Sequence, residues 1–325
     1  MSIVELHNVR KAYDTKIAVH GLSFKIEPGT MFGLLGPNGS GKTSSIRMMI
    51  GITVPDSGSV SLFDRPFTRK VLTRVGYLPE ERGLYKKMNV LDQLVFLGQL
   101  HGLSAPVASR RASLWCERLD IVEAIPKKTE DLSKGMQQKI QFIAALLHDP
   151  DLILMDEPFS GLDPVNSFLL MSTLVDLCSI GKAVLFSTHR MDQVEKFCNS
   201  IALIHRGHLV LSGSMREIKS IYPRNRVVIH FEGGDGFLNH PSIEHVKRYN
   251  GNVEIKLRPS ATLAEDAQSL LAQAIAHARV SRFEVMEPTL EEIFIEKVQE
   301  TSPVKNGHDL SLAQLDQPNK GGLDA

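Results

Sequence analysis

The chain has 325 residues, a length that accommodates two domains of ordinary size. Its 37 lysine and arginine residues balance its 37 aspartate and glutamate residues, which argues against a bulk binder of nucleic acid or anionic lipid. The three cysteines are odd in number and show no paired metal-ligand spacing, so we expect ordinary reduced thiols at Cys116, Cys178 and Cys198.

The first 80 residues or so predict an antiparallel hairpin region followed by a strand, a loop and a helix. Residues 3–9 and 17–26 read as strands, and the apolar run at 31–35 is short enough for a buried parallel strand. Ile46, Met49 and Ile50 then recur at helical spacing. A loop between such a strand and helix is well placed to bind phosphate, because the helix N-terminus attracts anions.

That loop, residues 36–43, reads Gly-Pro-Asn-Gly-Ser-Gly-Lys-Thr and matches a P-loop. Its glycines let backbone N–H groups converge on phosphate oxygens. Lys42 supplies a mobile cation for the β- and γ-phosphates, and the Thr43 hydroxyl is placed to ligate magnesium. The plainer alternative is a glycine-rich turn beside a surface lysine, which the flanking strand and helix disfavour. We expect nucleotide contacts from Gly36, Pro37, Asn38, Gly39, Ser40, Gly41, Lys42, Thr43 and Ser44.

Residues 90–149 predict a mainly helical region. Leu91, Leu94, Val95 and Leu97 crowd one helix, residues 109–119 suggest a second, and a third is expected at 133–147. The alternation of strands and helices resumes at residue 152 and continues through strands near 183–187 and 201. A hairpin then turns at residues 206–207 between strands at 202–204 and 208–211.

The strand at residues 152–157 ends in two adjacent carboxylates, Asp156 and Glu157. Burying them is costly unless a cation or a reaction requires them. One acid can hold magnesium through its water shell, and the next can accept a proton from an attacking water. A strand-end turn that caps a helix is the alternative, and Pro158 together with the upstream P-loop argues against it.

Three further segments accompany the P-loop and the paired acids. Residues 132–138 read Leu-Ser-Lys-Gly-Met-Gln-Gln, residues 160–164 read Ser-Gly-Leu-Asp-Pro, and the strand at 183–187 is followed by Thr188 and His189. In this order and spacing, the five motifs resemble an ABC ATPase over roughly residues 1–222. The resemblance implies an α/β fold: a P-loop NTPase core with an antiparallel β subdomain and a helical subdomain at about 89–149. It also implies ATP and Mg²⁺ as cofactors.

The resemblance implies a role for individual side chains as well. In such proteins ATP lies between two heads, and the P-loop of one faces the signature segment of the other, which residues 132–138 match in this chain. Tyr13 matches the aromatic that stacks on adenine, although alone it would read as a packing residue. Asp156 matches the magnesium acid and Glu157 the general base. His189 matches the switch at the γ-phosphate, although alone it would read as a loop histidine.

Residues of the signature segment are implied to act on the partner's nucleotide. Ser133 and Gly135 match the groups that reach its γ-phosphate, with Gly135 at a helix N-terminus whose dipole favours anions. Asp163 matches the turn that links the two sites across the dimer. The family's commonest signature has a second glycine and a glutamine where this chain has Lys134 and Met136. The lysine either adds a charge toward phosphate or points into solvent.

Glu80 is a second departure from the family pattern, because most heads carry a magnesium-contacting glutamine there. A carboxylate still offers an oxygen to the metal, although it adds a negative charge close to the triphosphate. The alternative is a solvated loop acid. Residues 76–85, Gly-Tyr-Leu-Pro-Glu-Glu-Arg-Gly-Leu-Tyr, and residues 287–294, Glu-Pro-Thr-Leu-Glu-Glu-Ile-Phe, resemble one subgroup. This subgroup comprises the ATPase subunits of sodium-export-like and other ABC-2 type exporters, which carry an extra C-terminal domain.

The subgroup implies an ATP-hydrolysing subunit that powers a membrane exporter. Its partners would be a membrane permease subunit, docked by a short helix near residues 80–88, and a second ABC ATPase subunit, either identical or related, with no nucleic acid. The sequence shows no export segment and no run of roughly 18 apolar residues, so we expect a cytoplasmic protein peripheral on the inner face of the membrane. The cargo stays open.

Two other classes of protein share a P-loop. A soluble ABC ATPase acting on ribosomes or DNA usually holds two heads or a long coiled coil, whereas this chain has one P-loop and no sustained heptads. A small-molecule phosphotransferase would leave the segment at 132–138 unexplained.

Residues 225–300 predict a small α+β accessory domain after a boundary near 223–225. Strands are expected at 227–231, 253–257 and 280–285, and helices at about 263–278 and 289–298. Capping boxes are expected at Thr262/Glu265 and Thr289/Glu292. We expect a ferredoxin-like or similar sheet, used either for packing and dimerisation or for binding a regulatory ligand. The polar segment 301–325 predicts a disordered tail.

Overall fold

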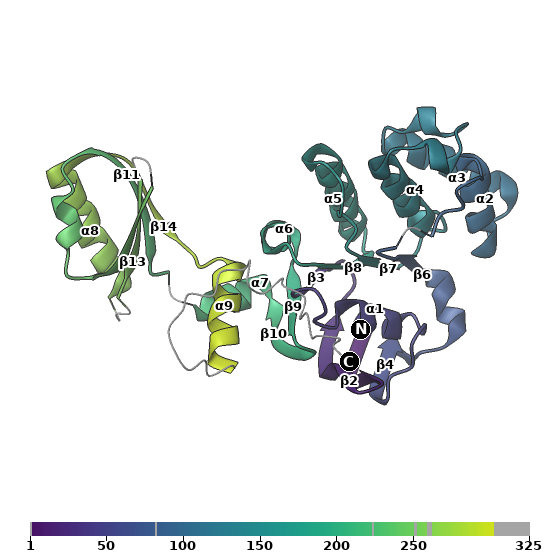
Figure 1. Cartoon of the computed structure of the whole chain (residues 1–325), viewed down its shortest axis with the longest axis horizontal. Helices are drawn as coiled ribbons and strands as arrows, with labels where there is room; N and C mark the ends of the chain where they lie inside the picture. Colours follow the sequence, from purple (N-terminus) through teal and green to yellow (C-terminus); the bar gives the residue numbers. More distant parts are fainter. Residues whose placement is uncertain (1, 82, 223, 250–251, 259–261, 302–325) are drawn as a thin grey trace, which may run out of the picture. The chain divides into compact units, whose positions relative to one another are not determined.

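Figure 1 shows a computed structural model of the chain, which describes residues 2–81, 83–222, 224–249, 252–258 and 262–301. The predicted tail, apart from Thr301, lies outside the described residues. The described chain forms two compact units, one ending at Ser214 and one spanning Met215–Thr301. The boundary proposed near residues 223–225 stays a prediction, because the short helix α7 (Met215–Ile221) before it groups with the second unit.

The N-terminal part of the first unit forms a four-stranded antiparallel sheet. Its strand order is β2-β1-β4-β5. Both predicted hairpin strands are present, and β1 extends further than predicted because Tyr13 still pairs with Lys16 across the turn. The bounds are β1 Val4–Tyr13, β2 Lys16–Ile26, β4 Ser57–Leu62 and β5 Arg65–Pro66.

A second, six-stranded sheet forms the centre of the first unit, in the order β10-β9-β3-β8-β7-β6. Five strands are parallel, and β10 adds an antiparallel edge through its hairpin with β9. Every residue of β3, β7 and β8 is buried, as expected for parallel strands covered on both faces. The bounds are β3 Met31–Leu35, β6 Val75–Leu78, β7 Leu152–Asp156, β8 Ala183–Thr188, β9 Ser200–His205 and β10 His208–Ser214.

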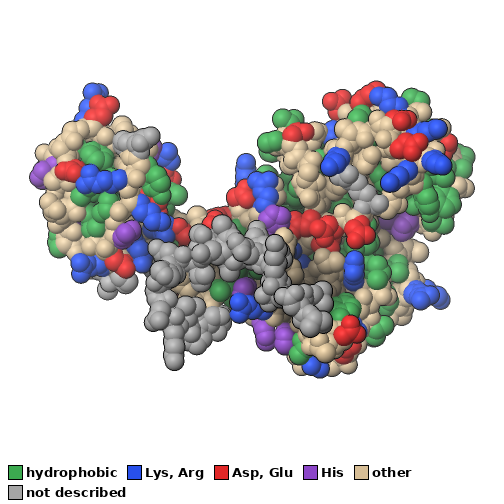
Figure 2. All heavy atoms as spheres, viewed as in Figure 1, with side chains coloured by type: hydrophobic (Ala, Val, Ile, Leu, Met, Phe, Trp, Pro, Cys, Tyr) green, Lys and Arg blue, Asp and Glu red, His purple; other side chains and the backbone are tan. Residues whose placement is uncertain are grey.

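The helix α1 (Lys42–Met49) contacts strands of both sheets, and its apolar residues join a single core with them. Because β3, β7 and β8 are parallel, their carboxyl ends meet at one edge. That edge brings together the P-loop after β3, the acids at the end of β7 and the histidine after β8. Figure 2 shows acidic side chains gathered on the first unit near β7 and β8.

Three helices form the predicted helical subdomain, and the second begins four residues earlier than expected, with a proline near its N-terminus. Two more helices, α5 and α6, cover the central sheet further along the chain. None of the described helices is both long enough and apolar enough to cross a membrane. The bounds are α2 Val90–Leu100, α3 Ala105–Arg118, α4 Lys134–Leu146, α5 Pro164–Ser179 and α6 Met191–Phe197, with 3₁₀ turns η1 Arg69–Arg74, η2 Val122–Ala124 and η3 Thr129–Asp131.

The second unit is an antiparallel sheet in the order β12-β13-β11-β14, with α8 packed on one face. This is the arrangement of a ferredoxin-like β-α-β-β-α-β sheet in which the turn η4 stands in place of the first helix. The strand β12 was not predicted, because it is a mostly exposed edge strand rich in charge. The bounds are β11 Arg226–Gly233, η4 Gly236–Asn239, β12 Ile243–Tyr249, β13 Asn252–Leu257, α8 Leu263–His277, β14 Ala278–Met286 and α9 Leu290–Thr301.

The two predicted capping boxes of the second unit have different outcomes. Before α9, the Thr289 N–H donates to Glu292 Oε2 at 3.0 Å and the Glu292 N–H donates to Thr289 Oγ1 at 3.3 Å, so that box is confirmed. The box at Thr262 was wrong. Thr262 has φ −114° and ψ 32°, outside the extended region that a capping residue adopts, and makes no side-chain cap bond.

Candidate functional site

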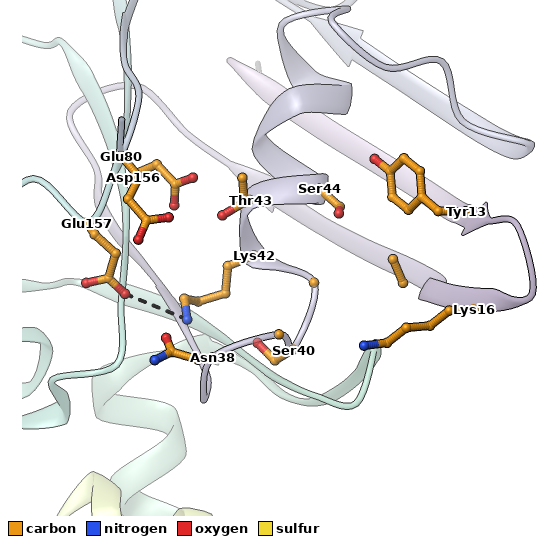
Figure 3. A pocket seen from close by; sticks show the side chains of 13 residues that line it. Tyr13, Lys16, Asn38, Ser40, Lys42, Thr43, Ser44, Glu80, Asp156 and Glu157 are labelled. Atoms are coloured by element: carbon orange, nitrogen blue, oxygen red, sulfur yellow. Dashed lines mark ion pairs between the residues drawn. The ribbon is translucent and has the colours of Figure 1, made fainter. Parts of the chain in front are cut away.

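A pocket of about 380 Å³ opens beside the P-loop at the carboxyl edge of the central sheet. Figure 3 shows its lining side chains, which come from the N-terminal sheet, the P-loop and α1, the loop after β6, and the end of β7 with the residue that follows it. The volume suits a small molecule. Its lining residues are Tyr13, Lys16, Ala18, Asn38, Gly39, Ser40, Gly41, Lys42, Thr43, Ser44, Glu80, Asp156 and Glu157.

Two glycines allow the P-loop to fold as tightly as it does. Gly36 has φ 153°, and a Cβ there would lie 2.1 Å from the Ile204 carbonyl oxygen. Gly41 has φ 109°, and a Cβ there would lie 2.4 Å from the Ala18 carbonyl oxygen. Any other residue would strain the backbone and clash with neighbouring backbone at both positions. The chain therefore approaches β2 and β9 closely enough to direct the loop toward the pocket.

Lys42 is buried at the start of α1, with its amine inside the curve of the loop. Its Nζ donates to the carbonyl oxygens of Gly36 at 2.7 Å and Pro37 at 3.2 Å, and lies 3.7 Å from Glu157 Oε1. Burial lowers the pKa of Lys42, and the nearby carboxylates of Glu157, Asp156 and Glu80 oppose that shift. The amine is thus held at the position where an anionic ligand would meet it.

Asp156 ends β7 and is only 1% exposed. The Ser187 hydroxyl of β8 donates to its Oδ1 at 2.5 Å, whereas its Oδ2 has no hydrogen-bond partner among the described residues. A buried carboxylate oxygen without a donor is unfavourable unless a cation or water satisfies it. The oxygens of Asp156, Thr43 and Glu80 line the same pocket and are ligands that Mg²⁺ prefers, so the residues present fit a magnesium site.

Both the backbone and the side chain of Glu157 make contacts that fix its position. It has φ 48°, and its N–H donates to the Ser187 carbonyl oxygen at 3.2 Å and hydroxyl at 3.1 Å. The side-chain Oε1 lies 3.1 Å from Nδ1 of His189. Because an ionised carboxylate only accepts, Nδ1 carries the proton in this contact. A carboxylate fixed beside the P-loop amine can accept a proton from a water placed against a phosphate.

Glu80 lies on the exposed loop after β6 and lines the pocket opposite the P-loop. Burial, followed by the charges of Asp156 and Glu157, raises its pKa. Gln141 of α4 fixes this loop, because its Nε2 donates to the carbonyl oxygens of Pro79 at 3.0 Å and Glu81 at 3.2 Å. The charges of Asp156 and Glu157 therefore act on the Glu80 carboxyl across the pocket.

The remaining expected site residues do not line this pocket. Ser133 caps α4 by accepting from the Met136 N–H at 3.2 Å, and Gly135 follows in the first turn. Asp163 caps α5 by accepting from the Asn166 N–H at 2.9 Å. His189 reaches the pocket only through Glu157. No residue of the segment at 132–138 lines the chain's own P-loop pocket, although Gln138 Nε2 donates to the Pro158 carbonyl oxygen next to Glu157.

Sequence reasoning missed four residues that shape the site: Lys16, Ala18, Gln141 and Ser187. Lys16 begins β2 immediately after the two-residue turn that follows Tyr13, and this position was its only signal. Ser187 interrupts an apolar strand next to the β7 acids, a signal that could have been used. The contact of Gln141 with the Glu80 loop spans 60 residues and had no local signal.

Two known protein families match parts of this chain, and the first match includes the P-loop and the paired acids of the pocket. The family described as "ABC transporter" matches residues 19–160, and "ATP-binding protein DrrA1-3-like, C-terminal domain" matches residues 213–298. The second match begins two residues before α7, near the start of the second compact unit.

Individual relatives and solved structures agree. The chain is 41% identical to the uncharacterized ABC transporter ATP-binding protein YhaQ of Bacillus subtilis, over 91% of this chain and 98% of that protein. It is 33% identical to the linearmycin resistance ATP-binding protein LnrL of the same organism, covering 90% and 97%. Among solved structures, "Structure of ATP binding subunit of ABC transporter" superposes with a TM-score of 0.63 at 26% identity, covering 68% of this chain and 93% of that one.

Proposed function

The chain belongs to the ATP-binding proteins of ABC transporters, and from that membership we propose that it is the ATP-hydrolysing subunit of an exporter. Two named relatives support the direction of transport. LnrL is a linearmycin resistance ATP-binding protein, and a Nod factor export ATP-binding protein I of Cupriavidus metallidurans is 36% identical over 67% of this chain and 73% of its own length. The soluble alternative is not favoured.

The observation that carries the proposal is the placement of Glu157 between the P-loop and His189. ATP phosphates would lie on the loop at residues 36–44, with Tyr13 against adenine. Glu157 would accept the proton of the attacking water, while the His189 N–H keeps its oxygen oriented. Thr43, Glu80 and Asp156 would hold Mg²⁺, which neutralises phosphate charge when bound.

A second ATPase subunit would complete each site. Ser133 and Gly135 lie outside the chain's own pocket, yet they present a helix N-terminus suited to an anion. We propose a head-to-tail dimer in which these residues close over the partner's ATP and Asp163 links the two sites. The partner is either a second copy or a related chain.

A membrane permease subunit is the second proposed partner. An apolar pocket of about 360 Å³ lies between β6, the 83–84 loop, α2 and α4, with Leu84 and Leu97 among its lining residues. Lys86, Lys87 and Lys128 line a neighbouring hollow. We propose that a short permease helix docks here, which would place the protein in the cytoplasm on the inner face of the membrane.

Co-purification tests the exporter. A membrane protein that binds the chain in detergent should be lost on Leu84→Asp, while nucleotide binding remains. The matched control is Leu114→Asp, because Leu114 is 55% exposed on α3 and lies outside the pocket. Association with ribosomes or DNA in the absence of any membrane protein would contradict the proposal and favour the soluble alternative.

A further inference from the structure

The pocket beside the P-loop contains three carboxylates, two from the end of β7 and a third from the loop after β6. Asp156, Glu157 and Glu80 line it with the amines of Lys42 and Lys16 (Figure 3). Lys42 already donates to two loop carbonyls and lies 3.7 Å from Glu157. The lining therefore carries more negative than positive side chains, although its proposed ligand is itself a polyanion.

A second observation is the buried carboxylate oxygen at the end of β7, which a cation could satisfy. Asp156 is almost completely buried, and its Oδ2 has no hydrogen-bond partner among the described residues. In a low-dielectric setting, such an oxygen is stabilised far more by a metal ion than by the phosphates of a nucleotide. A nucleotide that arrives without its metal meets this uncompensated charge directly.

We propose that Glu80 makes the pocket selective for the metal complex of a nucleotide over the free nucleotide. The inference rests on the proposed function of this pocket as the ATP site. Without metal, the charge of Glu80 adds to that of Asp156 and repels the phosphates; with metal, the same oxygen joins the set that faces the cation. A glutamine would retain an oxygen without the charge.

The test measures the binding of ADP to the full chain by titration calorimetry, once with Mg²⁺ and once with EDTA. Glu80→Gln should tighten metal-free ADP binding by about ten-fold, the scale of one added charge in a partly solvated pocket. Binding of Mg-ADP should tighten less or weaken, so the ratio of the two affinities falls. The substitution lies on an exposed loop and leaves the core untouched.

Glu81→Gln is the matched control, because it removes the same charge one residue along, on an exposed side chain outside the pocket lining. It should leave both affinities unchanged. The proposal is overturned if Glu80→Gln leaves metal-free affinity unchanged, or if Glu81→Gln changes the ratio equally. Failure of the ATP site itself has a different signature: Lys42→Ala would then bind ADP as well as the parent chain under both conditions.

Discussion

Glu157→Gln is the substitution that best separates chemistry from binding. The amide has the size of the carboxylate and can still accept from His189 Nδ1, which lies 3.1 Å from Oε1 in the parent. It cannot take up a proton, so hydrolysis should slow by about 10² to 10⁴, equivalent to about 3 to 5 kcal/mol in the barrier. Lys42 keeps both of its loop carbonyl contacts, so ATP binding should remain.

The assay pairs phosphate release under single-turnover conditions with ATP affinity by calorimetry. ATP that is bound but not hydrolysed should also hold the proposed dimer closed, which gel filtration with ATP would detect. Asp192→Asn is the control, because it neutralises an exposed acid of α6 that pairs with Arg190. Turnover within a few-fold of the parent in Glu157→Gln would refute the assignment of the base.

Three further outcomes are expected. Lys42→Ala should weaken ATP binding itself, and unchanged affinity by calorimetry would count against the P-loop assignment. Gly41→Ala should abolish nucleotide binding and lower the unfolding temperature, because its Cβ would lie 2.4 Å from the Ala18 carbonyl oxygen at φ 109°; a normally stable, ATP-binding variant would contradict this. Burial, aided by His101, lowers the pKa of His148 to about 4. As pH falls from about 6.5 toward 4, the His148 imidazole therefore takes up a proton in the unfolded chain before it does so in the folded chain, and the free energy of unfolding decreases. His148→Asn should reduce this dependence of the unfolding temperature on pH. An unchanged pH dependence would exclude His148 as its source.

The sequence predicted the fold class and family because the informative residues are local. The P-loop, the paired acids and the histidine each lie at the end of an apolar strand, and parallel pairing then brings strand ends to one edge. Their order along the chain carried enough information to place them on a known architecture. The comparisons with known proteins confirm that part.

Other features depend on contacts that span long stretches of sequence. β12 is a charged edge strand whose place is set by pairing with β13, so periodicity alone did not identify it. The hydroxyl of Ser187 contacts Asp156 from the neighbouring strand, and Gln141 fixes the Glu80 loop from a distant helix. These residues refine the site through tertiary packing, which local patterns do not encode.

The composite ATP site is tested most directly by mixing two inactive variants. Lys42→Ala removes the P-loop amine, and Gly135→Asp adds a negative charge to the signature segment. A Cβ at Gly135 meets only Leu162 Cδ2, at an ordinary contact distance of 3.6 Å, so a side chain can begin there without a backbone clash. Each variant alone should lack ATPase activity, and the mixture should recover part of it through the one site that combines an intact P-loop with an intact signature segment. Full activity of Gly135→Asp by itself would contradict the composite site.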